Sequence, residues 1–128
     1  MKTATGVLVA CGVAVASGLL GTPNAEPAPN LQQFIVHYTT GPSWVADAPF
    51  MSQPYAGHHS ANLSKMRSDG VILFGARYSD KGMIIVNAES EAEARMLVER
   101  DSAVVTGTFI YEIESLHPFY FGCIESQS

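Results

Sequence analysis

The sequence predicts an α+β domain of the ferredoxin-like class, because its segments follow the order β-α-β-β-α-β. Four short runs rich in β-branched and aromatic residues have the composition of strands, at 34–38, 71–75, 83–88 and 109–114. Two further segments repeat apolar residues at the spacing of a helix, at 54–68 and 91–101. In this order, two helices cover one face of a four-stranded antiparallel sheet.

The first half of the domain supplies one strand and one helix. The strand Phe-Ile-Val-His-Tyr at 34–38 is followed by a loop at 39–53 that is rich in glycine, proline and short polar residues. The helix at 54–68 comes next, and Gly70 ends it, since glycine is the usual residue just beyond a helix.

The second half supplies a hairpin, a helix and a last strand. A hairpin-like connection at 76–82 joins the second and third strands. The motif Ser-Glu-Ala-Glu at 90–93 has the form of a capping box, and it opens a helix that ends at Arg100 or Asp101. The strand at 109–114 alternates apolar with partly polar positions, as an edge strand does.

The two central apolar runs carry apolar side chains on both faces. Every position in 71–74 and in 83–86 is apolar, whichever way its side chain points. A sheet with helices on one side and water on the other should alternate apolar with polar residues. Because so short a chain has no spare element to cover the second face, we expect a homodimer joined through the sheet faces.

The first 25 residues differ in composition from the rest. Lys2 precedes an uncharged run rich in Ala, Val, Leu and Gly, which is typical of a secretory signal peptide cleaved after Ala25. An uncleaved membrane anchor and a lipoprotein site at Cys11 are the alternatives, and membrane contact is expected only if the leader is kept. The protein is therefore expected to be secreted or periplasmic. Its segments are a signal peptide at 1–25, a flexible linker at 26–33, the folded domain at 34–121 and a C-terminal tail at 122–128.

Charge and motif content exclude several classes of function. The formal net charge is −5 and no basic cluster is present, so nucleic acid is not an expected partner. No CxxC, HExxH or Cys/His cluster predicts a metal site, and no cofactor is expected. Loss of the leader would leave Cys123 as the only cysteine, either as a free thiol or in a bridge between chains.

Two polar residues stand on otherwise apolar helix faces. His59 begins the series His59, Leu63, Met66, and Asp101 ends the series Ala94, Leu97, Val98, Asp101. Since an unpaired buried polar group is costly, we expect each to need the other. The topology brings the start of the first helix and the end of the second to the same rim of the sheet. The sequence therefore predicts a His59–Asp101 dyad.

Other polar residues are expected at the same rim. Tyr38 ends the first strand, while Arg77 and Lys81 lie in the connection between the second and third strands. Convergent polar groups beside an apolar core are the usual form of a small-molecule site. The alternative is a structural pair, with His59 as a satisfied core histidine and the two cations as solvated surface charges.

These residues resemble the YCII-related (YciI-like) family along almost the whole mature chain, from 34 to 119. The residues that carry the resemblance are, in order, a first strand ending at Tyr38, His59 with Leu63, Gly70, Gly75, Gly82, Glu91-Ala92, Asp101, Gly107 and Pro118-Phe119. The chain departs from the pattern at Ser102 and Ala76, where the family commonly has proline.

The resemblance implies a ferredoxin-like fold that dimerises into a dimeric α/β barrel, with a His–Asp active site at His59 and Asp101. We therefore expect a cofactor-free acid/base enzyme of isomerase or lyase type that acts on a small organic acid. Arg77, Tyr38 and Lys81 would bind the substrate. The alternatives are a homodimer that binds a small molecule without catalysis, and an interaction module in which the pair is structural.

Overall fold

The computed structural model describes residues 28–126, so the predicted signal peptide lies outside the described residues. The described helices and strands all belong to one compact unit, Pro29–His117. Their order is β1 (Gln32–Thr40), a 3-10 turn η1 (Phe50–Ser52), α1 (Ala56–Ser68), β2 (Ile72–Tyr78), β3 (Lys81–Ala88), α2 (Glu91–Glu99), α3 (Ser102–Val105) and β4 (Phe109–Ser115).

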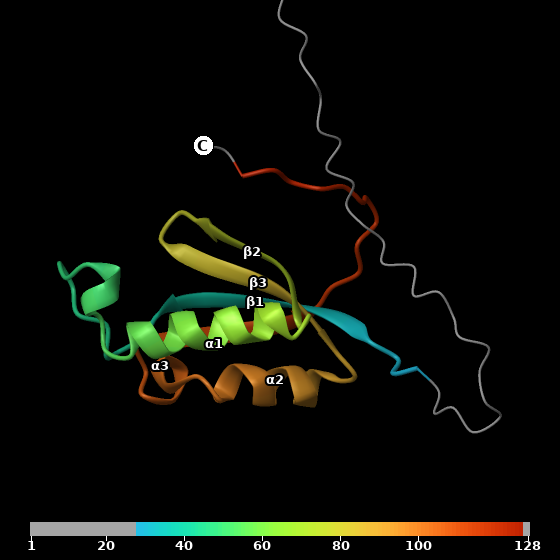
Figure 1. Ribbon diagram of the computed structural model, residues 1–128. Helices are drawn as coiled ribbons and strands as arrows, with labels where there is room; N and C mark the ends of the chain where they lie inside the picture. Colours follow the sequence, from blue (N-terminus) through green and yellow to red (C-terminus); the bar gives the residue numbers. More distant parts are fainter. Residues whose placement is uncertain (1–27, 127–128) are drawn as a thin grey trace, which may run out of the picture. The chain divides into compact units, whose positions relative to one another are not determined.

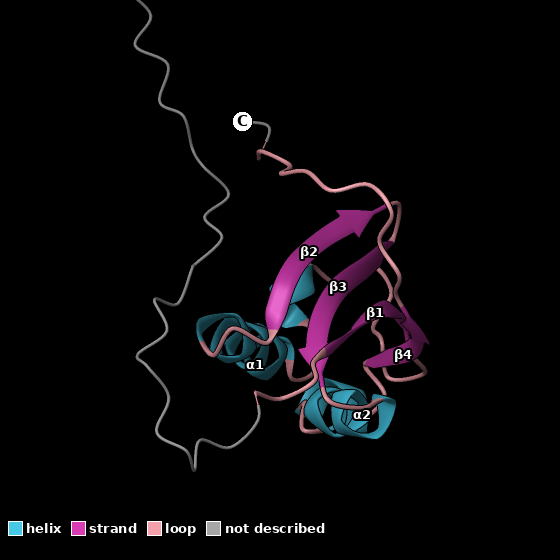
Figure 2. Cartoon of the chain, turned by 90° about the vertical axis from the view of Figure 1, so that its right-hand side faces the viewer, coloured by secondary structure: helices cyan, strands magenta, loops and turns pink. Residues whose placement is uncertain are grey.

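The four strands form one antiparallel sheet in the order β2-β3-β1-β4. The helices lie together on one face of this sheet, and no described helix lies on the other (Figures 1 and 2). The predicted α+β class with a βαββαβ order is therefore confirmed, and the architecture is compatible with a ferredoxin-like fold.

The core lies between the sheet and the helices. In β1, Phe34, Val36 and Tyr38 alternate with less buried residues, as expected for a strand with one covered face. The other strands and the helices supply further buried apolar side chains, which are Ile72, Ile84, Val86, Ala88, Phe109 and Ile113 from the sheet and Met66, Ala94, Val98 and Ala103 from the helices. The predicted inward stripes of both helices are part of this core.

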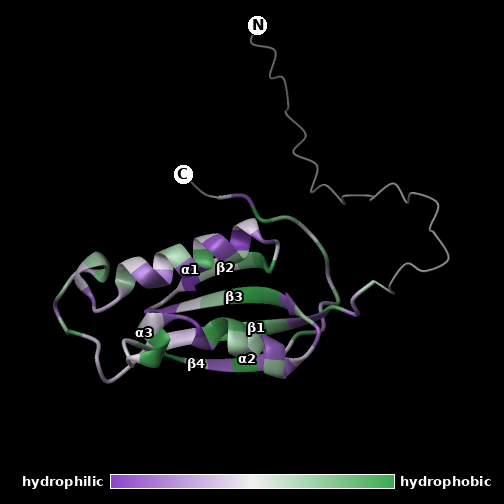
Figure 3. Cartoon of the chain, turned by 60° about the horizontal axis from the view of Figure 1, so that its bottom comes forward, coloured by the Kyte–Doolittle hydropathy of each residue, from purple (hydrophilic) through white to green (hydrophobic). Residues whose placement is uncertain are grey.

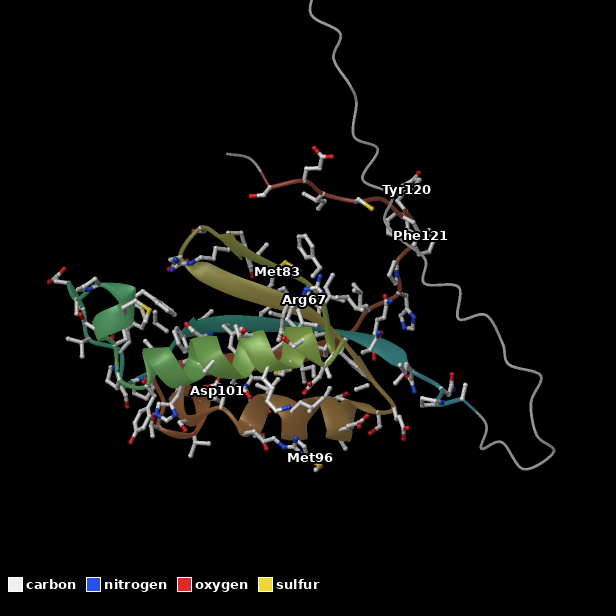
Figure 4. All side chains as sticks on the ribbon, viewed as in Figure 1. Arg67, Met83, Met96, Asp101, Tyr120 and Phe121 are labelled. Atoms are coloured by element: carbon white, nitrogen blue, oxygen red, sulfur yellow. The ribbon has the colours of Figure 1, made fainter. Side chains whose placement is uncertain are left out.

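The second face of the sheet has no helix over it and carries apolar side chains. Met83 points away from the helices (Figure 4), and β3 is among the most hydrophobic segments in Figure 3. Its register partners on this face are His37 and Ala76. The register of β2 shifts between Ile72 and Phe74, so these two apolar residues lie on opposite faces instead of the same one.

The connection between β2 and β3 is shorter than the sequence suggested. The strand pairing continues to Tyr78 and Lys81, which leaves a turn of only Ser79 and Asp80. Ser79 adopts a positive φ of 51°, as tight hairpin turns require. Arg77 and Lys81 therefore lie on paired strands, and the prediction that they lie in a loop is wrong.

The second predicted helix is in fact two helices. α2 ends at Glu99, and the four-residue α3 begins after Asp101, which has an extended backbone (φ −77°, ψ 117°). The stripe of Ala94 and Val98 continues at helical spacing to Asp101, so periodicity alone hides the break. Ser90 caps α2 as predicted, since its side chain accepts a hydrogen bond from the Glu93 N–H.

The segment after His117 forms no helix or strand up to residue 126, and its side chains are exposed. Cys123 is disulfide-bonded in the structure of the whole chain. The free thiol and the bridge between chains are predictions for the chain without its leader, and they stay predictions. Among residues 28–126, no helix is both long enough and apolar enough to cross a membrane.

Candidate functional site

His59 and Asp101 meet as predicted. The Nδ1 atom of His59 lies 2.5 Å from the Oδ2 atom of Asp101, and both residues are buried, with 7% and 1% of their surface exposed. Asp101 lies at the junction of α2 and α3, beside α1 (Figure 4). Because a carboxylate only accepts hydrogen bonds, Nδ1 donates this one. The ring nitrogen that remains, Nε2, is then the unprotonated one in the neutral imidazole.

Asp101 has a second role, which the sequence pattern did not predict. It is the N-cap of α3, and its Oδ1 atom accepts a hydrogen bond of 2.9 Å from the Ala103 N–H. The sequence pattern predicts this carboxylate at the C-terminus of a helix, where the helix dipole would oppose it. At the start of α3 the dipole favours it instead. Both carboxylate oxygens therefore have partners, and the side chain joins α3 to α1.

The ring of His59 is enclosed by aromatic side chains. Its centroid lies 4.7 Å from that of Phe109, 5.3 Å from that of Tyr38 and 6.3 Å from that of Phe50. Within residues 28–126, no hydrogen bond reaches Nε2, yet this atom is not among the fully buried unpaired polar atoms. The imidazole is thus held at Nδ1 and accessible at Nε2.

A cavity of about 820 Å³ lies against the helix-covered face of the sheet, and His59 is part of its wall. Tyr38, Arg77 and Lys81 line the same cavity, so four of the five predicted site residues share it. Asp101 does not line it and lies behind the imidazole. Other residues that line the cavity were not predicted as site residues, among them Trp44, Phe50, Ser60, Asp80 and Phe109.

The cavity carries more positive than negative charge at its edge. Two cations, Arg77 and Lys81, and one carboxylate, Asp80, line the cavity. The whole chain, by contrast, has a formal net charge of −5. The guanidinium carbon of Arg77 lies 5.5 Å from the centre of the Phe50 ring, a cation–π distance. This contact keeps the Arg77 charge beside the cavity.

Tyr38 is the unusual polar group of the site. It is 5% exposed, and within the described residues its hydroxyl has no hydrogen-bond partner. Burial, and then the charge of Asp101, raises the pKa of its phenol far above the usual value, with a smaller contribution from Tyr111. The Tyr38 hydroxyl therefore stays protonated beside the dyad at any physiological pH.

The loop that carries Trp44 and Phe50 is held in place by a buried amide. The Gln53 side chain accepts from the Val45 N–H at 2.8 Å and donates to the Val45 and Ala48 carbonyls at 2.8 and 2.9 Å. The loop is also bonded to the segment just before β4, where the Thr108 hydroxyl donates to the Pro54 carbonyl at 2.8 Å. This wall of the cavity is therefore preorganised.

Gly41 allows the same loop to approach the segment before β4. Its N–H donates to the Thr108 carbonyl at 2.9 Å, and a Cβ atom at this position would lie 2.1 Å from the Gly107 oxygen. Gly107 itself has a φ of +79°, a conformation that other residues rarely adopt. The close contact therefore depends on glycine at both positions.

Within residues 28–126, no group of three or more His, Cys, Asp or Glu side chains is placed to hold a metal ion. No family model, curated protein or solved structure matches this chain. The resemblance to the YCII-related family therefore rests on sequence motifs alone.

Proposed function

We propose that this protein is a cofactor-free acid/base enzyme that moves a proton on a small organic acid, with His59 as the catalytic group. The observation that carries this proposal is the state of the His59 ring. Asp101 accepts from Nδ1 at 2.5 Å, while Nε2 stays accessible beside a cavity. An imidazole held in one tautomer with its other nitrogen accessible is the usual arrangement of a general base.

The two residues of the dyad have different roles. Asp101 holds the ring and stabilises the imidazolium that forms when Nε2 takes a proton from a carbon or oxygen of the substrate. The proton then returns from Nε2 to another atom of the substrate, which gives an isomerisation, or it leaves with a departing group, which gives an elimination. Asp101 is a positioning residue, because it does not line the cavity.

The charge of the cavity supports an acidic substrate. Arg77 and Lys81 offer donors for a carboxylate, and a bidentate bond from Arg77 would orient the substrate as well as attract it. Tyr38 borders the same space, and its buried phenol stays protonated there.

Proton exchange in heavy water tests the proposal. The protein is incubated with small carboxylic acids that carry an acidic C–H bond, such as pyruvate and phenylpyruvate, and deuterium uptake is followed by NMR. We expect uptake above the buffer rate, reduced about a hundredfold or more in His59→Gln. The control is His58→Gln, which changes the exposed neighbour on the same helix. Wild-type uptake at the buffer rate for acids that bind would overturn the catalytic proposal.

A non-catalytic binding protein is the second candidate, and the capping bond of Asp101 favours it. The pair joins α1 to α3, so burial of His59 and Asp101 has a structural explanation that needs no reaction. Binding of an acid without exchange, together with a large loss of stability in His59→Ala, would support this candidate.

We also propose that two copies associate through the sheet face that carries Met83, as in the dimeric α/β barrels of the YCII-related family. Partly exposed apolar side chains on this face, Ile35, Phe74 and Ile85, support the proposal. Light scattering should give the mass of a dimer for the wild type and that of a monomer for Ile85→Glu. Met96→Glu, on the exposed side of α2 (Figure 4), is the control. Secretion remains part of the proposal, tested by the N-terminal sequence of the mature protein.

A further inference from the structure

The cavity is larger than a small acid requires. Ligand pockets measure about 300 to 1,000 Å³, and this one, at about 820 Å³, lies near the upper end. A three- or four-carbon acid would leave most of the space to water, with little apolar area buried on binding. The volume therefore points to a substrate with a substantial apolar body.

The cavity also extends across the sheet. Arg77 lies on β2 at one edge of the sheet and Phe109 on β4 at the other, and both line the cavity. With strands about 4.8 Å apart, four strands span about 14 Å. The lining of the cavity therefore runs from the cations on β2 to Phe109 on β4.

One wall of the cavity is aromatic, and Phe50 in this wall lies beside the Arg77 guanidinium. Trp44 lies 5.6 Å and Phe50 6.1 Å from the ring of Phe109, and Phe50 and Phe109 are stacked with an angle of 30° between their planes. Flat ring faces favour flat ligand surfaces, because offset stacking adds to the free energy of apolar burial.

We propose that the natural ligand of this cavity is a monocarboxylate on a flat apolar body the size of two fused rings. The carboxylate lies at Arg77 and Lys81, and the ring system lies against the part of the cavity wall formed by Trp44 and Phe109. This inference rests on the proposed function, since it assumes that the cavity beside His59 binds the substrate, and it replaces the general small acid with a larger, amphipathic one.

Equilibrium binding of three matched probes tests the inference. These probes are 2-naphthoate, benzoate, which has one ring fewer, and 2-naphthamide, which keeps the rings and lacks the charge. Calorimetry should show 2-naphthoate binding about tenfold or more tightly than benzoate, because the second ring buries more apolar area. We also expect 2-naphthoate to bind about tenfold more tightly than 2-naphthamide, because the amide cannot form charged hydrogen bonds with Arg77 and Lys81.

The position of the ligand is measured separately. Trp44 is the only tryptophan of the chain, so its indole N–H gives a single resonance in a ¹⁵N NMR spectrum. We expect 2-naphthoate to shift this resonance. Arg77→Met keeps the aliphatic stem and removes the charge, so it should bring the affinities for 2-naphthoate and 2-naphthamide close together. The matched control is Arg67→Met, an exposed arginine on α1 that does not line the cavity.

Any of three results overturns the inference: equal affinity for benzoate and 2-naphthoate, equal affinity for 2-naphthoate and 2-naphthamide, or an unshifted Trp44 resonance at saturation. Absence of binding by all three probes overturns it as well. These readouts are independent of turnover. If proton exchange fails but the protein still prefers 2-naphthoate to benzoate and to 2-naphthamide, only the catalytic proposal is rejected. If small acids exchange but these binding preferences are absent, only the inference about the ligand is rejected.

Discussion

Two polar clusters on the helix-covered face of the sheet contain similar residues, but one cluster is buried and the other is exposed to solvent. Tyr38 and Tyr111 are register partners on β1 and β4. Tyr38 lies beside the buried His59–Asp101 pair, and its hydroxyl has no hydrogen-bond partner among residues 28–126. The Tyr111 hydroxyl, by contrast, donates to Glu99 at 2.7 Å in a cluster open to solvent.

The second cluster is an ordinary surface network. Arg95 donates to Glu91 at 2.7 Å and to the Tyr111 hydroxyl at 3.4 Å, and about half of the Arg95 and Glu91 side-chain surface is exposed. Solvent screens such charges and competes for their hydrogen bonds. The comparison teaches that burial, and not residue type, makes the first cluster sensitive to change and suited to chemistry.

The largest expected difference between the clusters is in stability. Asp101→Ala removes the partner of a buried histidine and the cap of α3, so the free energy of unfolding should fall by about 3–5 kcal/mol. Glu91→Ala removes an exposed partner of Arg95 and should change it too little to measure. Urea denaturation at pH 7 checks both. Equal effects would show that the His59–Asp101 pair is solvated.

The second difference is in alkaline solution. Because the folded protein raises the pKa of Tyr38, the unfolded chain loses this proton first as the pH rises. Below pH 10 the free energy of unfolding therefore does not change with pH through this group, and above pH 10 it falls by about 1.4 kcal/mol per pH unit. Urea denaturation between pH 9 and 11 should show this loss in the wild type and a flatter profile in Tyr38→Phe.

Tyr111→Phe is the control for this pH series. The pKa of Tyr111 is also raised, first by partial burial and then by its bond to Glu99, but solvent screens this group. Its removal should flatten the alkaline profile much less than removal of the Tyr38 hydroxyl. Identical profiles for the two variants would mean that the two phenols have similar surroundings.

The smallest expected effects are those of the two Tyr→Phe variants at pH 7, which should change the free energy of unfolding in opposite directions. At pH 7, Tyr38→Phe removes a buried hydroxyl without a partner and should raise the free energy of unfolding by about 1 kcal/mol. Tyr111→Phe removes a hydroxyl that donates to Glu99 and should lower it by about 1 kcal/mol or less. Thermal denaturation measures both, and a loss of stability in Tyr38→Phe would show that its hydroxyl has a partner in solution.

Part of the site could be predicted from the pattern of residues. His59 stands four residues before Leu63 on the inward stripe of α1, and the βαββαβ order brings the start of α1 near the end of α2. The pairing with Asp101 follows from these two facts. The N-cap role of Asp101 does not follow from these facts. An aspartate followed by Ser102 and Ala103 is nevertheless a signal for the start of a helix.

Local sequence therefore determined the class of fold, the positions of most helices and strands, and the contact between His59 and Asp101. Each depends on side-chain periodicity or element order, which neighbouring residues encode. Only the tertiary structure decided the cavity, the aromatic wall that includes Trp44 and Phe50, and the unpaired hydroxyl of Tyr38. Cavities and unmet hydrogen bonds arise from the packing of segments far apart in the chain, and no local pattern records what that packing leaves unfilled.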